Sequence, residues 1–149
     1  HFFFGMNDQG RAAVVETAGN HNCHLILRGG TSGPNWDKES LDDAEARLNK
    51  AEQTVSIMVD ASHANSGKSE VRQAEVVEEL GKLIGAGDER ITGIMMESFL
   101  EAGAQKITDG RNGLVYGKSV TDACMDWETT DRLLRTLAAE VRKRRQARD

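Results

Sequence analysis

Charged or ionisable side chains follow three short apolar runs of this sequence at a nearly constant interval. Arg28 and His63 lie 35 residues apart, and Glu97 follows 34 residues after His63. This interval suits a strand–helix–strand unit, which takes roughly 30 residues or more. Parallel strands of such units deliver their C-terminal ends to one face of the sheet. The spacing therefore predicts an arginine, a histidine and a glutamate at one rim.

The rest of the pattern favours an α/β fold with a parallel sheet. A β-hairpin comes first, followed by three strand–helix units whose right-handed crossovers would place the helices outside the strands. The last helix follows about 30 residues without strong periodicity, a length that is typical of functional loops. The expected strands are 1–6, 12–17, 23–28, 54–60 and 91–97, and the expected helices are 41–51, 69–85 and 128–146.

Helix caps and the core-facing side of one helix can also be predicted. Ser40 is the expected N-cap of the helix at 41–51, and Thr129 and Thr130 are placed to cap the last helix. In the helix at 69–85, apolar residues recur every three or four positions, which indicates a buried face. Its members are Val71, Ala74, Val77, Leu80 and Ile84.

Composition argues against several classes of function. The 149 residues suffice for at most one ordinary domain, and 19 basic against 24 acidic side chains give a net charge of −5. We expect no nucleic-acid partner, because phosphate backbones are held mainly by excess Lys and Arg. We also expect a cytoplasmic protein with no membrane partner: no apolar run approaches the roughly 20 residues of a span, and Cys23 and Cys124 give no disulfide framework. Because the chain opens at His1 directly into an apolar run, we expect a fragment of a longer protein.

The densest polar cluster follows the second strand of the expected parallel sheet. Residues 60–66 read Asp-Ala-Ser-His-Ala-Asn-Ser, which places the His63 imidazole and several hydrogen-bonding groups within one turn. One interpretation is a capped strand-to-helix loop in which the histidine has a purely structural role and its ring is hydrogen-bonded within the protein. The other is a functional site, and the arginine and glutamate expected at the neighbouring strand ends favour it.

Glu97 ends a strand that we expect to be buried, where an unpaired carboxylate is very costly. A salt bridge to Arg28 or a bound metal ion would each satisfy it. Asp122 offers a second carboxylate. Together with His63, these groups suit a divalent transition metal such as Mn, Fe, Co or Zn better than Ca, which prefers oxygen ligands alone. Arg28, which precedes two glycines, is suited to a bidentate grip on a phosphate.

With these residues assembled, the chain closely resembles the 3-deoxy-D-arabino-heptulosonate 7-phosphate (DAHP) synthases of the bacterial and fungal type. The likeness runs over essentially the whole chain. It is carried by the segments 19–20, 23–30, 60–66, 93–98, 116–124 and 127–128.

The resemblance implies a transferase with a (β/α)8 TIM-barrel fold. Its reaction would be the metal-dependent, aldol-type condensation of phosphoenolpyruvate with erythrose 4-phosphate, which gives DAHP and phosphate. This is the first step of the shikimate pathway to the aromatic amino acids. Because eight strands need roughly 250 residues, we expect the C-terminal portion of the barrel, about three βα units preceded by an inserted β-hairpin. The missing N-terminal half would be a partner of this chain.

The resemblance also implies roles for individual residues. His63, Glu97 and Asp122 would be three of four metal ligands, the fourth being a cysteine that no cysteine of this chain matches. His63 and Arg28 would be catalytic. Arg28 would hold the phosphate of phosphoenolpyruvate, and Asp122 would also lie near the aldose phosphate. The family's Lys-Pro-Arg-Thr segment and its lysine near phosphoenolpyruvate are absent from this sequence.

Two regions follow from the same resemblance. Residues 1–20 would be the hairpin insertion, a possible allosteric site for an aromatic amino acid effector, with Phe3, Gly5 and Val15 at pocket-lining positions. Residues 21–149 would hold the βα units of the catalytic domain. Many relatives carry Val-Thr-Lys where this chain reads Met-Asn-Asp at 6–8. A plain edge hairpin that packs against a neighbour is the alternative.

Two other functions stay open at this point. One is a related synthase that joins phosphoenolpyruvate to a different aldose phosphate, and the other is a non-catalytic fragment or regulatory half that binds an effector or a subunit. We expect a homo-oligomer, and we expect the isolated chain to be inactive.

Overall fold

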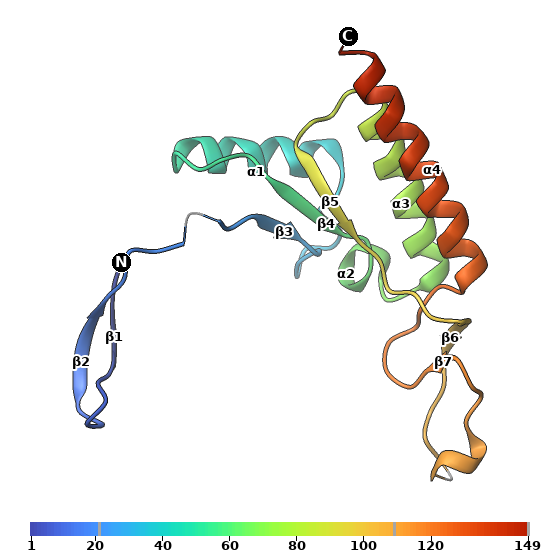
Figure 1. Ribbon diagram of the computed structural model, residues 1–149, viewed down its shortest axis with the longest axis horizontal. Coiled ribbons are helices and arrows are strands. Elements are labelled where there is room, and N and C mark those ends of the chain that lie inside the picture. Colours follow the sequence, from blue (N-terminus) through green and yellow to red (C-terminus); the bar gives the residue numbers. More distant parts are fainter. Residues whose placement is uncertain (21, 109, 149) are drawn as a thin grey trace.

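The computed structural model describes residues 1–20, 22–108 and 110–148. Figure 1 shows a central body of strands and helices from which two strand pairs project. Among these residues, none of the helices combines the length and the apolar character that a membrane crossing requires.

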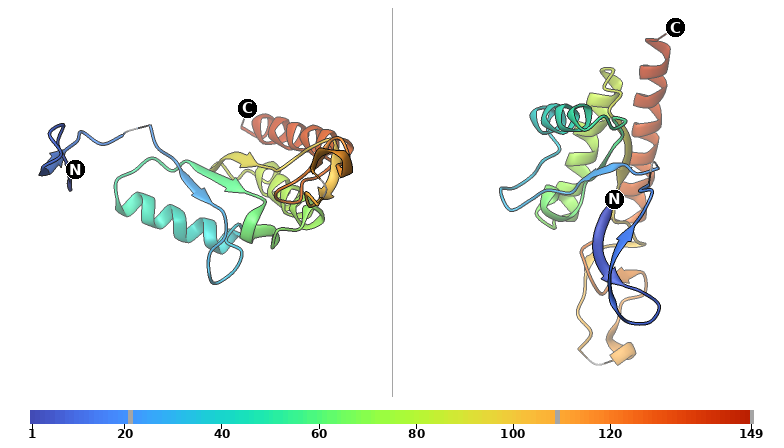
Figure 2. Two further views of the ribbon diagram at one scale, coloured as in Figure 1. Left: turned by 90° about the horizontal axis from the view of Figure 1, so that it is seen from below. Right: turned by 90° about the vertical axis from the view of Figure 1, so that its left-hand side faces the viewer.

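The first projecting pair is an antiparallel hairpin of β1 (Phe2–Met6) and β2 (Ala12–Glu16). Its register pairs Phe3 with Val15 and Gly5 with Ala13. The turn is closed by backbone hydrogen bonds from the Asn7 amide to the Arg11 carbonyl and from the Gly10 amide to the Asn7 carbonyl. Figure 2 shows the hairpin standing clear of the helices.

The central sheet has three parallel strands in the order β3 (Leu25–Leu27), β4 (Ile57–Asp60) and β5 (Ile91–Met95). Leu27 pairs with Val59, and Asp60 pairs with Met95, so the strands end at nearly the same level. The prediction of a mixed α/β fold with a parallel sheet is therefore confirmed. Each strand is shorter than predicted, and backbone hydrogen bonds such as that from the Ala61 amide to the Met95 carbonyl extend slightly beyond the strand ends.

Three long helices and one single turn complete the central body. They are α1 (Lys38–Lys50), α2 (His63–Ser66), α3 (Glu70–Gly85) and α4 (Trp127–Gln146).

The predicted caps of α1 and α4 are wrong. The Asp37 carboxylate caps α1 by accepting from the Ser40 amide at 2.7 Å, and the Asp126 carboxylate caps α4 by accepting from the Thr129 amide at 2.8 Å. In both cases an aspartate lies three residues before the expected cap, at the point where the backbone is still extended. Ser40 and Thr129 are therefore donors to the cap rather than caps.

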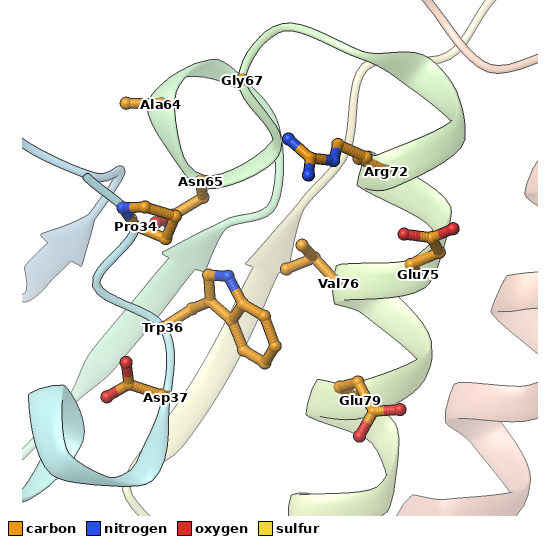
Figure 3. A pocket seen from close by; sticks show the side chains of 10 residues that line it. All are labelled: Pro34, Trp36, Asp37, Ala64, Asn65, Gly67, Arg72, Glu75, Val76 and Glu79. Atoms are coloured by element: carbon orange, nitrogen blue, oxygen red, sulfur yellow. The ribbon is translucent and has the colours of Figure 1, made fainter.

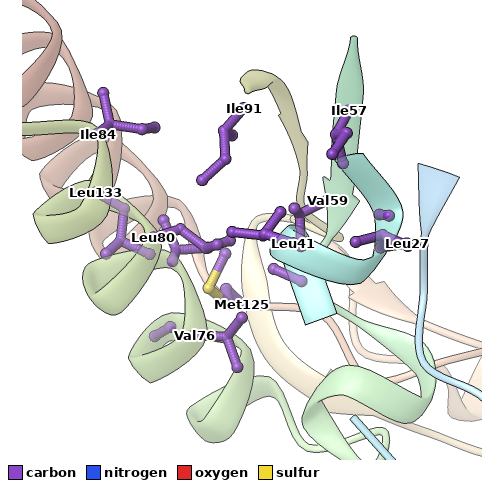
Figure 4. Packing of buried hydrophobic residues seen from close by; sticks show 14 residues of the cluster. Leu27, Leu41, Ile57, Val59, Val76, Leu80, Ile84, Ile91, Met125 and Leu133 are labelled. Atoms are coloured by element: carbon purple, nitrogen blue, oxygen red, sulfur yellow. The ribbon is translucent and has the colours of Figure 1, made fainter. Parts of the chain in front are cut away.

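The core lies between the sheet and the helices (Figure 4). Ile57 and Val59 of β4 are fully buried on the helix side, whereas Ile26 of β3 is 49% exposed on the opposite face. Because strand side chains alternate between faces, the helices cover one face of the sheet only. Val71, predicted to belong to the buried stripe of α3, is 65% exposed, and the buried residue near that end of the helix is Gln73.

The second projecting pair occupies the segment that shows no periodicity in the sequence. It consists of β6 (Glu101–Ala104) and β7 (Lys118–Ser119), which are parallel, with a short 3-10 turn (Gly110–Gly113) between them. A bridge from Ser98 to Met125 joins the end of this segment to the chain just after β5, and a bridge from Gly103 to Cys124 lies within the segment. Strands of two to four residues are too short to produce a readable alternation.

Candidate metal centre

The strand ends bring the predicted chemical groups to one rim. Arg28 follows β3, Asp60 is the last residue of β4, and Glu97 lies just after β5. His63 begins the α2 turn with a left-handed backbone at φ 47°. This conformation is uncommon for a residue with a side chain, and it places the imidazole beside the end of its own strand.

A buried aspartate orients the imidazole. Oδ2 of Asp60 lies 2.7 Å from Nδ1 of His63, and Oδ1 accepts from the Ser62 amide at 2.9 Å. Asp60 is 4% exposed, so its charge has few other partners. An Nδ1–H bound to a carboxylate leaves the lone pair on Nε2, which is the arrangement that metal-binding histidines use. The histidine is thus satisfied on one nitrogen and available on the other.

Glu97 faces the available nitrogen. Its Oε1 lies 4.0 Å from Nε2 of His63, and its Oε2 accepts a hydrogen bond from the Ser62 hydroxyl at 2.7 Å. The salt bridge between Glu97 and Arg28, which was one of the two predicted alternatives, does not form. Arg28 instead places its Nε 3.8 Å from Oδ2 of Asp60, with 59% of its side chain exposed.

Asp122 completes the cluster from the segment after β7. One ligand atom from each of His63, Glu97 and Asp122 lies within 4.8 Å of the others, and all three residues are half-buried. The side chains therefore converge as the sequence predicts. One nitrogen and two carboxylate oxygens, with the nitrogen oriented by a second carboxylate, form a donor set that fits a divalent cation.

Cys124 lies at the edge of this cluster, and its thiol donates to the Asp122 carbonyl at 3.5 Å. Burial raises the pKa of this thiol. A hydrogen bond with Ser119 opposes the rise, and the charges of Glu97 and Asp122 add to it. Cys124 is thus half-buried beside Asp122, whereas Cys23 is exposed.

Two asparagines hold the backbone on both sides of Arg28. The side-chain Nδ2 of Asn65 donates to the backbone carbonyls of Leu27 at 3.1 Å and Asp60 at 2.8 Å. Oδ1 of Asn65 accepts from the backbone amide of Asn35 at 2.8 Å, and Oδ1 of Asn35 accepts from the backbone amide of Gly29 at 2.7 Å. Sequence reasoning assigned no role to either asparagine, because a polar residue in a loop (Asn35) or in a single helical turn (Asn65) carries no periodic signal.

A pocket of about 660 Å³ opens on the other side of the α2 turn (Figure 3). Trp36 in the loop before α1 faces Val76 on α3, and the Arg72 side chain extends from the start of α3 toward the turn at Gly67. None of its lining residues belongs to the His63–Glu97–Asp122 cluster. This pocket and the convergent chemical groups are therefore separate features.

Fold and site together define an α/β chain whose parallel strands present a candidate divalent-cation site at their C-terminal ends. The chain belongs to the DAHP synthetase I family, whose sequence model matches residues 1–135.

Individual relatives agree with this assignment. A phospho-2-dehydro-3-deoxyheptonate aldolase of Corynebacterium glutamicum is 55% identical over 153 residues, which cover 99% of this chain and 41% of that protein. The Phe-sensitive enzyme of that name from Escherichia coli is 43% identical over 145 residues, covering 97% of this chain and 41% of the relative.

A solved structure shows the same arrangement of elements. The phospho-2-dehydro-3-deoxyheptonate aldolase of Francisella tularensis SCHU S4 superimposes with a TM-score of 0.82 at 43% sequence identity. The match covers 97% of this chain and 41% of that one. The chain thus spans about two fifths of the length of these proteins, and its fold is consistent with a fragment of theirs.

Proposed function

We propose that this chain supplies the C-terminal part of a metal-dependent DAHP synthase. The reaction would join phosphoenolpyruvate to erythrose 4-phosphate and release phosphate, at the first step of the shikimate pathway. The observation that carries the proposal is the convergence of His63, Glu97 and Asp122 within 4.8 Å, in a chain of the DAHP synthetase I family.

In this proposal His63, Glu97 and Asp122 hold a divalent transition metal such as Mn, Fe, Co or Zn. A metal bound there would act as a Lewis acid that polarises the aldehyde oxygen of the aldose phosphate. Asp60 keeps the proton of His63 on Nδ1, so that Nε2 stays free to bind. Ser62 donates to one Glu97 oxygen and leaves the other directed at the imidazole.

Arg28 would hold the phosphate of phosphoenolpyruvate. Its side chain is 59% exposed at the same rim, and Asp60, the carboxylate paired with it among the described residues, is 3.8 Å away. A guanidinium in that position retains donors for an anion, and its planar fork matches two phosphate oxygens. Holding this phosphate would orient the substrate, which lowers the entropic part of the barrier. Asp122 would lie on the side of the second substrate, the aldose phosphate.

The sheet supports the assignment to a section of a (β/α)8 barrel. Its strands are parallel, its helices cover one face, and the opposite face carries half-exposed apolar residues such as Ile26. In a closed barrel that face becomes the packed interior. The strands β3 and β5 are the two edges of the described sheet. We propose that they pair with the N-terminal part of the barrel, which the relatives carry outside the matched region.

The hairpin at 1–20 is proposed as an inserted effector site for an aromatic amino acid. The Escherichia coli relative is described as Phe-sensitive. In this chain Phe3 pairs with Val15, and a Cβ added at Gly5 would lie 3.0 Å from Cγ2 of Val15. The Val15 and Phe3 side chains therefore lie directly over Gly5, and the three residues share one face of the hairpin. With its exposed Phe2 and Phe4, the hairpin also offers a contact for a homo-oligomer.

The decisive experiment is His63→Ala in the complete protein, with DAHP formation and Mn²⁺ binding measured side by side. Both are expected to be lost, and excess metal should not restore full activity. His24→Ala is the matched control, because His24 is exposed and outside the cluster. Undiminished DAHP formation by the His63 variant, or after complete removal of metal by a chelator, would contradict the proposal.

A further inference from the structure

The side chain of Gln73 is fully buried at the start of α3, although it is an amide among apolar neighbours. Burying an amide without hydrogen bonds is unfavourable, because the group loses its bonds to water. A glutamine in this place must therefore make specific bonds. The side-chain oxygen and the side-chain nitrogen of Gln73 both form hydrogen bonds with the same residue.

That residue is Glu97, and the contact is with its backbone. The Glu97 amide donates to Oε1 of Gln73 at 2.6 Å, and Nε2 of Gln73 donates to the Glu97 carbonyl at 3.2 Å. The strand β5 has already ended at Met95, so Glu97 lies beyond the ladder that would otherwise fix it. The glutamine replaces the missing strand neighbour with two hydrogen bonds.

The same carbonyl links Glu97 to the segment that carries Asp122. The Met125 amide donates to it at 3.0 Å, and Met125 is 2% exposed. The Phe99 amide in turn donates to the Met125 carbonyl at 2.9 Å. The backbone at Glu97 is therefore a junction between helix α3, the end of β5 and the chain just after Asp122.

We infer that Gln73 is a positioning residue of the metal centre: it fixes the Glu97 backbone, so that the Glu97 carboxylate faces His63 and Asp122. The inference rests on the proposed metal site and assigns a new residue to it. Gln73 touches neither substrate nor cation in this scheme. Its effect is transmitted because a ligand set tolerates displacements of only about 0.5 Å before affinity falls.

Ser62 and Gln73 position different parts of Glu97. The Ser62 hydroxyl sets the rotation of the Glu97 carboxylate through its Oε2, and Gln73 sets the position of the residue as a whole. An apolar side chain at position 73 could fill the same space but could not form the two hydrogen bonds to the Glu97 backbone. Replacing Gln73 with such a side chain would leave the Glu97 amide without its acceptor.

The test compares Gln73→Met with Val77→Ala in the complete protein. Methionine keeps the volume and removes both hydrogen bonds. Val77 is fully buried one turn further along α3, and as an apolar side chain it makes no hydrogen bond, so its truncation lowers stability without touching Glu97. Three quantities are measured: the dissociation constant for Co²⁺ by titration of the metal-free protein, the hydrogen exchange rate of the Glu97 amide, and the unfolding temperature.

Gln73→Met is expected to weaken Co²⁺ binding roughly 10- to 100-fold, the range found for residues that support metal ligands, and to accelerate exchange at the Glu97 amide. Val77→Ala should lower the unfolding temperature and leave the metal affinity within about twofold of the parent protein. Gln73→Asn, which keeps the amide but shortens its reach, is the second variant if the methionine variant does not fold, and it should weaken binding in the same direction.

Unchanged Co²⁺ affinity in a folded Gln73 variant would overturn the inference, as would an equal loss of affinity in Val77→Ala at matched stability. His63→Ala separates the two levels of the argument. If that variant still binds Co²⁺ normally, the assignment of the metal site to this cluster is wrong. If it loses Co²⁺ while Gln73→Met keeps it, only the positioning role is wrong.

Discussion

Nδ1 of His63 lies 2.7 Å from Oδ2 of Asp60, three residues earlier at the buried end of β4. This contact turns a strand-end carboxylate into a support for the imidazole rather than a fourth member of the cluster. It also explains why His63 tolerates a positive φ, since the strained backbone is held by the hydrogen bond and by the turn that follows.

Asp60→Asn should weaken metal binding roughly 10- to 100-fold, because the amide no longer stabilises the His63 tautomer that leaves Nε2 free. Titration of the metal-free protein with Co²⁺ measures this directly. Asp37→Asn is the matched control, since asparagine caps a helix about as well as aspartate and Asp37 lies outside the cluster. Equal metal affinity in the two variants would show that Asp60 does not orient the ligand.

Arg28→Lys should raise the KM for phosphoenolpyruvate about tenfold or more, because a point charge cannot replace a bidentate fork whose charged hydrogen bonds are worth roughly 1.5–3 kcal/mol. Steady-state kinetics of the complete protein give the value. Arg47→Lys, at an exposed position on α1 paired with Asp43, should leave it unchanged. The phosphate role fails if the two variants have the same KM.

Gly29→Ala and Gly30→Ala should differ sharply although the residues are adjacent. Gly29 has φ +79°, and an added Cβ would lie 2.6 Å from Cβ of Ala64 and 2.9 Å from the Asn65 amide nitrogen. Gly30 has nothing within 4 Å of an added Cβ. The left-handed backbone and the overpacking together should lower the free energy of unfolding of the Gly29→Ala variant by about 2–5 kcal/mol.

The same Gly29 variant should weaken both phosphoenolpyruvate and metal binding, because the clash pushes the α2 turn away from the Arg28 loop. Gly30→Ala should change neither by more than about twofold. Denaturant unfolding and Co²⁺ titration test the pair. Similar behaviour of the two variants would mean that the contact between Gly29 and Ala64 does not hold the two loops together.

Arg90 should tie stability to pH through its carboxylate partners. It contacts Asp88, Asp42 and Glu45 at 2.6, 2.6 and 3.1 Å. Burial alone raises the pKa of the Asp88 carboxyl, but the hydrogen bonds from Arg90 outweigh it and leave that pKa below the ordinary 3.8. Such a group contributes stability above its ordinary pKa, and the contribution is lost as the pH falls through the lowered value.

Asp88→Asn should therefore lower the unfolding free energy by about 1–3 kcal/mol at pH 7, and the difference should shrink once the pH falls below about 4. Thermal unfolding between pH 7 and 3 measures the trend. Asp43→Asn, which removes a mostly exposed pair with Arg47, should change stability by less than about 1 kcal/mol throughout. A constant difference for Asp88→Asn across the range would contradict the assignment.

The repeated interval in the sequence was enough to predict the parallel sheet and the shared rim of Arg28, His63 and Glu97. Strand–helix units have a narrow range of lengths, and their topology places strand ends on one side. The approximate places of the helices follow from apolar periodicity for the same reason, because a buried face must recur with the helix repeat. The caps were missed by three residues, since Asp37 and Asp126 lie outside the periodic runs.

Which polar residues serve the site was decided only by the tertiary structure. Gln73 occupies a place in the buried stripe of α3, four residues before Val77, and a polar residue in that stripe was the one sequence signal that could have marked it. Its partner is 24 residues away, and the partners of Asn65 include a carbonyl 38 residues away. Hydrogen bonds between side chains and distant backbone follow no sequence period, so they become visible only once packing has brought α2, α3 and the strand ends together. The sequence alone determined which chemical groups reach the rim, and the packed chain determined which buried amides hold them there, because burial obliges each amide to find a partner.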